Sequence, residues 1–168
     1  GSNNIGGDTV AGMIYCNIDK NDKNILYLDI GTDTAIVLKS RGNYSAVSVS
    51  TPAFDGEGIS CGMIPESGAV HDASVKNGEM KYSTVHEVVP EGVCGIGLVN
   101  IVAESMKSGK ITKNGEIIDG CVVISESVSV SQTDVDELMK QKSLIYSGIA
   151  EVLDKSGTGM DEVDEIIL

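Results

Sequence analysis

The stretch from Asn24 to Leu38 constrains the fold of this chain more than any other part of the sequence. Four residues, Ile25-Leu26-Tyr27-Leu28, lead directly into Asp29, and a second run rich in Ala, Ile and Val ends at Leu38. Short apolar runs on either side of a glycine-containing turn predict two strands joined as a hairpin. We therefore expect the chemistry of this region to lie in the turn, Asp29-Ile30-Gly31-Thr32-Asp33-Thr34.

The turn carries residue types that suit a magnesium-bound phosphate. A carboxylate at the end of a strand can hold the water shell of Mg²⁺, and backbone N–H groups around Gly31 and Thr32 would form a small concavity for phosphate. A Cβ atom at Gly31 would obstruct the approach of an anion to the main chain. The same residues are also common in an ordinary acidic hairpin turn, so the turn alone leaves both interpretations open.

Two further segments are rich in glycine. Three glycines fall in the ten positions from Phe54 to Met63, a density that is unfavourable for the backbone unless close approach or positive φ is needed; a plain connecting loop is the alternative. The segment 92–97 opens an apolar helix that we expect to end at Gly109. The free N–H groups and the positive dipole end at the start of this helix could bind an anion. Alternatively, the glycines of the segment allow close packing between the helix and a strand, and the two interpretations are not exclusive.

The remaining patterns predict the other elements of the chain. They are a helix beginning at 6–9 with Asp8 as its cap and ending near Cys16, a strand over 44–50 that completes a three-stranded meander, a hairpin of 69–75 and 79–86 turning at 76–78, a strand over 122–130, a long helix from 131–134 to 155–157, and a final strand over 162–168. His71 and His86 would approach across the predicted hairpin. Without a third ligand in register we expect surface residues there and no metal site.

Composition excludes several classes of function. The formal net charge of −13, from 25 acidic and 12 basic residues, disfavours nucleic acid and anionic membranes as partners. The four cysteines form no C-x-x-C pair, so we expect no zinc or iron–sulfur site made by this chain. No apolar stretch approaches the length of a membrane span and no signal peptide is evident, which predicts a cytoplasmic protein.

Five segments, in this order, carry a resemblance to one family. They are 6–12, 24–38, 51–63, 92–98 and 132–138. They resemble the actin-like (ASKHA) ATPase portion of the ferredoxin-linked proteins that reductively activate corrinoid proteins in anaerobic methyl-transfer pathways. The resemblance runs from Gly6 to Leu168 and implies an α/β fold. It would be a lobe of the actin-like, ribonuclease H-like type, with a mixed sheet, an antiparallel meander and crossover helices.

The resemblance also implies where nucleotide would bind. ATP or ADP with Mg²⁺ would be the cofactor, in a cleft between two lobes. Phosphate and Mg²⁺ would contact Asp29, Gly31, Thr32, Asp33 and Thr34; the cleft loops would include Gly56, Gly58, Gly95 and Gly97; and Gln132, Asp134 and Lys142 would lie on the nucleoside side. The structural alternative for Asp134 is a carboxylate in the first turn of a helix, and for Lys142 a solvated charge. No residue is a convincing catalytic base.

The chain also departs from the family pattern. We expect residues 1–2 to be an expression scar and residues 3–168 to be a partial domain, truncated at both ends. The first phosphate motif and an iron–sulfur domain would lie upstream, and an adenosine-binding turn would follow Leu168. Asp33-Thr34-Ala35 replaces the usual Asn-Gly-Glu, which adds a negative charge that disfavours phosphate unless a cation intervenes.

The resulting hypothesis is an ATP-dependent reductive activator of a corrinoid protein, in which an iron–sulfur domain outside this chain supplies the electron that converts Co(II) to Co(I). One alternative is a docking or dimerisation module that binds a corrinoid protein, or its own copy as a homodimer, and hydrolyses nothing. Another is an activator of a different radical or dehydratase enzyme.

Overall fold

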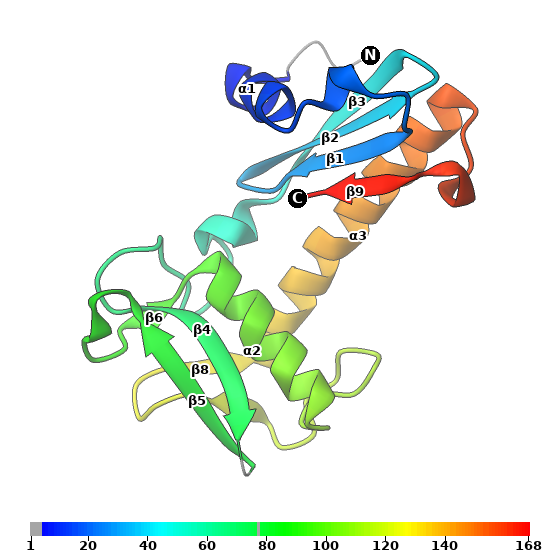
Figure 1. Cartoon of the computed structure of the whole chain (residues 1–168). Helices are drawn as coiled ribbons and strands as arrows, with labels where there is room; N and C mark the ends of the chain where they lie inside the picture. The colour runs from blue at the N-terminus through cyan, green and yellow to red at the C-terminus, as the bar shows by residue number, and fades with distance from the viewer. Residues whose placement is uncertain (1–4, 77) are drawn as a thin grey trace. The chain divides into compact units, whose positions relative to one another are not determined.

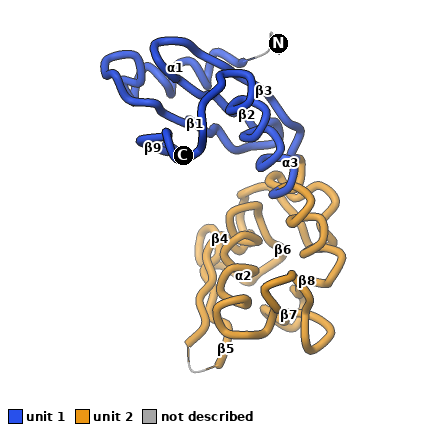
Figure 2. Tube along the Cα trace, turned by 90° about the vertical axis from the view of Figure 1, so that its right-hand side faces the viewer, with its two compact units in different colours: residues 1–51, 142–168 blue, residues 52–141 orange. Residues whose placement is uncertain are grey.

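The computed structural model describes residues 5–76 and 78–168 (Figure 1). The chain divides into two compact units (Figure 2). Unit 1 contains the chain up to Thr51 and residues Lys142–Leu168, and unit 2 contains Pro52–Gln141. No helix within the described ranges has both the length and the apolar composition needed to cross a membrane.

Unit 1 is built on a four-stranded sheet with the strand order β3-β2-β1-β9 (Figure 1). The strands are β1 (Ile25–Asp29), β2 (Asp33–Ser40), β3 (Asn43–Ser50) and β9 (Glu165–Ile167). The first three form the antiparallel meander that the sequence predicts. The final strand β9 pairs in parallel with β1, which makes the sheet mixed.

The two faces of this sheet are covered by different helices (Figure 1). On one face, Leu26, Leu28 and Ile36 pack with apolar residues of α3 (Gln132–Ser156). On the other, Ile25, Tyr27 and Val37 pack under α1 (Gly7–Tyr15) and the 3₁₀ turn η1 (Ile18–Lys20). Side chains alternate between faces along a strand, so consecutive residues of β1 serve the two layers in turn.

The helix predicted near residues 6–9 is confirmed, but its predicted cap is wrong. Gly6 is the N-cap residue of α1 and no side chain caps the helix. Asp8 lies in the first turn, where its carboxylate accepts a hydrogen bond from the Thr9 N–H at 2.9 Å. A carboxylate at this position still interacts favourably with the positive end of the helix dipole.

Unit 2 contains a three-stranded sheet with the order β5-β4-β6 and a separate hairpin. Its elements are η2 (Pro52–Asp55), β4 (Ala69–Lys76), β5 (Glu79–Thr84), η3 (Val85–Glu87), β6 (Gly92–Val93), α2 (Gly95–Lys107), β7 (Cys121–Val123) and β8 (Ser129–Ser131). The β4–β5 hairpin confirms the prediction; Asn77, in its predicted turn, lies outside the described residues. Because β5 ends at Thr84, His86 lies beyond the strand pair, in η3.

The single strand predicted over 122–130 is wrong, because the chain reverses within it. Residues Cys121–Val123 pair antiparallel with Ser129–Ser131. The Ser125 hydroxyl accepts hydrogen bonds from the N–H groups of Ser127 and Val128 at 3.3 and 3.2 Å. A serine that bonds to the backbone two or three residues on makes a turn without glycine or proline.

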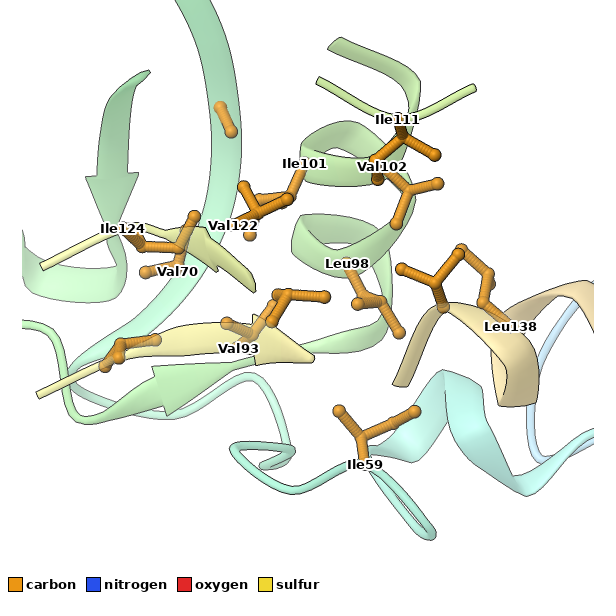
Figure 3. Close-up of a cluster of buried hydrophobic side chains, with 14 of the residues drawn as sticks. Ile59, Val70, Val93, Leu98, Ile101, Val102, Ile111, Val122, Ile124 and Leu138 are labelled. Atoms are coloured by element: carbon orange, nitrogen blue, oxygen red, sulfur yellow. The ribbon is translucent and has the colours of Figure 1, made fainter. Parts of the chain in front are cut away.

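The core of unit 2 is a large cluster of aliphatic side chains from the sheet, α2, the β7–β8 hairpin and the start of α3 (Figure 3). Val70, Val93, Leu98 and Leu138 are among its buried members. The 25-residue helix α3 supplies side chains both to this core and to the core of unit 1. It ends at Ser156, before Gly157 with φ of +62°, as predicted.

Candidate functional site

Asp29 and Asp33, which flank the turn between β1 and β2, line a pocket of about 570 Å³ in unit 1, whereas Gly31 and Thr32 of the turn are not among its lining residues. Its lining residues are Gly6, Asp8, Thr9, Asp29, Asp33, Ala35 and Ser48. The strand register places Asp29 opposite Ala35 and Ala35 opposite Ser48, so these three lie side by side on the sheet face that α1 covers. The pocket is therefore formed by one end of the meander and the N-terminus of α1.

Asp29 is held in this pocket by the helix. The Thr9 hydroxyl donates a hydrogen bond of 2.8 Å to Oδ2 of Asp29, and Thr9 is only 3% exposed. Two residues earlier on the same face of β1, the Tyr27 ring packs under α1. Burial raises the pKa of Tyr27, and the nearby charge of Asp29 adds to the effect, so the phenol stays protonated beside the carboxylate.

Thr51 stabilises the conformation of the β1–β2 turn through two hydrogen bonds to the main chain of the turn. Its N–H donates to the Thr32 carbonyl at 2.6 Å, and its hydroxyl donates to the Gly31 carbonyl at 2.6 Å. Because the single hydroxyl proton of Thr51 is used in that bond, the Thr34 hydroxyl donates to Thr51 Oγ1, also at 2.6 Å. Thr34 is fully buried, at 0% exposure, and is not among the residues that line the pocket. The hydroxyl of Thr34 thus supports the turn, and its predicted contact with a ligand stays a prediction.

Nothing in the described structure requires glycine at position 31. Its φ is not in the left-handed region, and an added Cβ would meet only the Asp33 carbonyl oxygen, at 4.0 Å. Packing and backbone conformation therefore give no reason for glycine here. Free access of a ligand to the main chain is a reason that remains.

The charge of the pocket limits what it can bind. Three carboxylates line it, from Asp8, Asp29 and Asp33, with no lysine or arginine among the lining residues. The carboxylates would repel a bare phosphate and attract a cation, and a cation bound beside a phosphate would reduce that repulsion. No group of three potential ligands among the described residues is placed to hold a metal ion alone.

Asp134, predicted on the nucleoside side, is engaged within unit 2. It is 1% exposed, and its carboxylate accepts four hydrogen bonds, from the N–H and hydroxyl of Ser60 at 2.6 and 2.7 Å and from those of Ser131 at 2.8 and 2.7 Å. Burial works to raise the pKa of Asp134, but these donors outweigh it and hold the pKa below its ordinary value. The geometry favours the structural alternative for this residue.

The other two residues predicted on the nucleoside side differ from each other. Gln132 accepts from the Ile117 N–H at 2.8 Å and donates to the Gly115 carbonyl and to Asp136, at 2.9 and 2.8 Å. Its side-chain amide therefore links the start of α3 to the turn that contains Gly115. Lys142 is exposed on α3, in the part that belongs to unit 1. Its predicted role stays a prediction.

The four glycines predicted in cleft loops have structural reasons of their own. Gly56 has φ of +85° and Gly58 has φ of +79°, which fits the sequence argument for positive φ. A Cβ at Gly95 would overlap the Phe54 carbonyl, and a Cβ at Gly97 would overlap the Val70 carbonyl. Of the two interpretations of the 92–97 segment, the structure supports close packing; anion binding there stays a prediction.

Comparison with known proteins identifies the fold family. Residues 23–168 match the family described as the C-terminal domain of RACo, the ASKHA domain. This chain belongs to that family. Its predicted α/β, actin-like fold is thereby confirmed. It also superposes on a solved structure named reductive activator for corrinoid, iron–sulfur protein, with a TM-score of 0.81 and 25% identity, covering 96% of this chain and 30% of that one.

Two relatives of this ASKHA domain carry names that concern corrinoid proteins. The corrinoid activation enzyme RamQ of Eubacterium limosum is 26% identical over 193 positions, covering 98% of this chain and 32% of that protein. The Co(II) methylated amine-specific corrinoid protein reductase of Methanosarcina barkeri is 24% identical over 185 positions, covering 95% of this chain and 34% of the relative. The chain spans about a third of the length of these proteins.

Sequence reasoning missed five residues that line the pocket of the ASKHA domain. They lie in segments recognised as a helix start and as strands, but none was assigned to the site: Gly6, Asp8, Thr9, Ala35 and Ser48. The position of Ser48 could have been predicted, because the register of the meander puts it beside Ala35. The position of α1 over Asp29 depends on packing between segments and had no local signal.

Proposed function

We propose that this ASKHA domain binds Mg–ATP and Mg–ADP at the unit 1 pocket and serves the ATP-dependent reductive activation of a corrinoid protein. An iron–sulfur domain outside these 168 residues would supply one electron to reduce Co(II) to Co(I). Family membership is consistent with nucleotide binding. The names of the relatives support a corrinoid protein as the partner.

The observation that carries the nucleotide assignment is the combination of an acidic pocket with an unobstructed turn. Asp29 lies at the end of β1 beside the pocket, and Gly31 follows it with open space where its Cβ would be. In the proposal, Asp29, Asp8 and Asp33 face the hydrated Mg²⁺, and the main chain at Gly31 and Thr32 faces the phosphate. The bound Mg²⁺ would neutralise phosphate charge that the carboxylates otherwise repel.

The test is calorimetric titration of the 168-residue chain with Mg–ATP and Mg–ADP, comparing the natural chain with Gly31→Ala and Asp29→Asn. Gly31→Ala should leave the melting temperature within about 2 °C, since an added methyl meets open space, yet weaken nucleotide binding at least about tenfold. Asp29→Asn should abolish measurable binding.

Asp154→Asn is the matched control for loss of a carboxylate, because Asp154 is exposed on α3 and does not line the pocket. It should bind as the natural chain does. Nucleotide binding that survives both Gly31→Ala and Asp29→Asn unchanged would refute this site.

One observation favours a second candidate function. Since no lysine or arginine lines the pocket, the chain alone lacks the cationic side chain that commonly contacts nucleotide phosphates. A docking module that binds a corrinoid protein without hydrolysing nucleotide would fit this. Pull-down of a purified corrinoid protein with equal yield in Mg–ATP and in EDTA would support it.

A further inference from the structure

We propose that Thr9 is a positioning residue that links two of the three pocket carboxylates and sets the orientation of Asp29. The inference rests on the proposed nucleotide site and concerns how that site is organised. Its basis is a pair of hydrogen bonds made by one residue of α1. The Thr9 N–H donates to Oδ1 of Asp8 at 2.9 Å, and the Thr9 hydroxyl donates to Oδ2 of Asp29 at 2.8 Å.

The hydroxyl of Thr9 distinguishes the two carboxylate oxygens of Asp29. A hydroxyl has one proton, and here it is directed to Oδ2 of Asp29. This leaves Oδ1 as the oxygen assigned to the ligand. Since Thr9 is 3% exposed, water does not readily replace it as the donor. A buried donor to a carboxylate restricts the rotation of that carboxylate, as partners of metal-ligating groups do elsewhere.

Thr9 reaches Asp29 at a place where α1 and β1 are in close contact. The Tyr27 hydroxyl lies against Gly12, at the place where any other residue would have its Cβ. Along the helix the contact with Asp29, at Thr9, comes before the contact with Tyr27, at Gly12, whereas along the strand Tyr27 comes before Asp29. The helix therefore runs antiparallel to the strand.

The contact between Gly12 and the Tyr27 hydroxyl requires glycine at this position of the helix. If Gly12 carried a side chain, either the Tyr27 hydroxyl or α1 would have to shift, and a shift of α1 would move the Thr9 hydroxyl away from Asp29. The contact between Gly12 and Tyr27 therefore holds the helix at the distance that the hydrogen bond requires. Thr9 thus depends on a residue one helical turn away, outside the pocket.

Thr9→Val and Thr9→Ser separate the hydroxyl from the shape of the side chain. Valine has the same shape and no donor, whereas serine keeps the donor and loses a methyl group. We expect Thr9→Val to weaken Mg–ADP binding about tenfold, the lower end of the range for loss of a partner that orients a ligating group. Thr9→Ser should bind within about threefold of the natural chain, which a purely volume-filling role for Thr9 would not predict.

A second measurement needs no nucleotide. The carboxyl carbon resonance of Asp29 and the two Hβ resonances of that residue report whether its side chain holds one rotamer. In Thr9→Val the carboxyl resonance should shift and the two Hβ resonances should converge through averaging, and in Thr9→Ser both should stay as in the natural chain. An Asp29 side chain that is unchanged in Thr9→Val would overturn the inference.

The two measurements distinguish the two possible failures. If the natural chain binds no Mg–nucleotide, the proposed function fails, while the Asp29 resonances still decide whether Thr9 orients that carboxylate. If the natural chain binds and Thr9→Val binds equally well, the inference fails and the proposed function stands. Thermal unfolding of each variant checks that α1 and the sheet remain folded.

Discussion

Asp134 shows how a single buried carboxylate can organise a part of this chain. It joins the segment around Ser60 to the start of α3 through four hydrogen bonds. Ser131 and Asp134 also form a reciprocal pair, since the Ser131 hydroxyl lies 3.3 Å from the Asp134 N–H. This is the capping-box arrangement with aspartate as its acid. The carboxylate therefore stabilises both the helix start and the glycine-rich loop.

Replacing Asp134 by Asn should lower the free energy of unfolding by about 2–4 kcal/mol at pH 7, because an amide N–H₂ would face backbone N–H donors in a buried site. Chemical denaturation measures this. Asp154→Asn, a change of the same type at an exposed position of α3, should alter stability by less than about 0.5 kcal/mol. Equal effects of the two changes would contradict a special role for Asp134.

The same carboxylate predicts a dependence on pH. Its folded pKa is lowered, so its contribution is complete above the unfolded value, about 3.9, and is lost as pH falls through the folded pKa. The difference in stability between the natural chain and Asp134→Asn should thus be constant from about pH 7 to pH 5 and shrink below about pH 4. Denaturation series at pH 7, 5, 4 and 3 test this, and a gap that widens in acid would contradict the assignment.

Asp33 offers a separate test of the charge argument at the pocket. It is exposed and lines the pocket with Asp8 and Asp29. Removing one carboxylate should favour an anion whose charge is not screened by a cation. We expect Asp33→Asn to bind ADP in EDTA about tenfold more tightly than the natural chain, with a smaller change for Mg–ADP. Calorimetry in both buffers measures the ratio, and weaker binding of Mg–ADP without tighter binding of ADP in EDTA would instead make Asp33 a direct partner of Mg²⁺.

The residue scale is also where sequence reasoning reached its limit. Asp29 and Asp33 could be assigned to the pocket because a carboxylate beside a glycine-containing turn is a local signal. Asp134 could not be interpreted in the same way. Its principal partner, Ser60, lies 74 positions earlier, and no pattern in either segment indicates the contact. Strand alternation places Thr34 on the opposite face of the sheet from Asp29, and its predicted contact with phosphate stays a prediction.

At the scale of elements, the contact between α2 and β4 depends on Gly97. An added Cβ would overlap the Val70 carbonyl, which is backbone and cannot move aside cheaply. Gly97→Ala should lower the free energy of unfolding by about 1–3 kcal/mol, the usual effect of overpacking. Gly7→Ala is the matched control, since it also adds a methyl near a helix start but meets nothing within 4 Å. It should be neutral or slightly stabilising. If Gly97→Ala were as stable as the natural chain, close packing would not explain the glycine at this position, and anion binding would remain as the alternative reason.

Elements with local signals were predicted well, and those that depend on distant pairing were not. The 24–50 meander has two short apolar runs, an alternating third segment and glycine-containing turns, so its three strands were predictable. The parallel pairing of β9 with β1 joins opposite ends of the chain and left no local trace. The turn at Ser125 was missed because alternation continues through it and a serine side chain, rather than glycine or proline, makes the reversal.

At the scale of the whole molecule, excess negative charge competes with a small number of ion pairs. Six ion pairs occur among the residues described, and they involve mostly exposed side chains. Such pairs contribute about 0–1 kcal/mol each and are weakened by salt. A net charge of −13 acts in the opposite sense, because screening relieves the repulsion that the folded chain experiences.

We expect the repulsion to dominate, so that salt stabilises this chain. Raising NaCl from about 10 mM to about 500 mM should raise the melting temperature by roughly 3–6 °C, equivalent to about 1–2 kcal/mol for a chain of this size. The double variant Asp22→Asn/Glu126→Gln removes two exposed carboxylates, one in each unit, that are in none of the six ion pairs. Its melting temperature at low salt should be higher than that of the natural chain, and its increase with salt smaller. A melting temperature that falls as NaCl is added would mean that the ion pairs, despite their exposure, outweigh the repulsion among the 25 acidic residues.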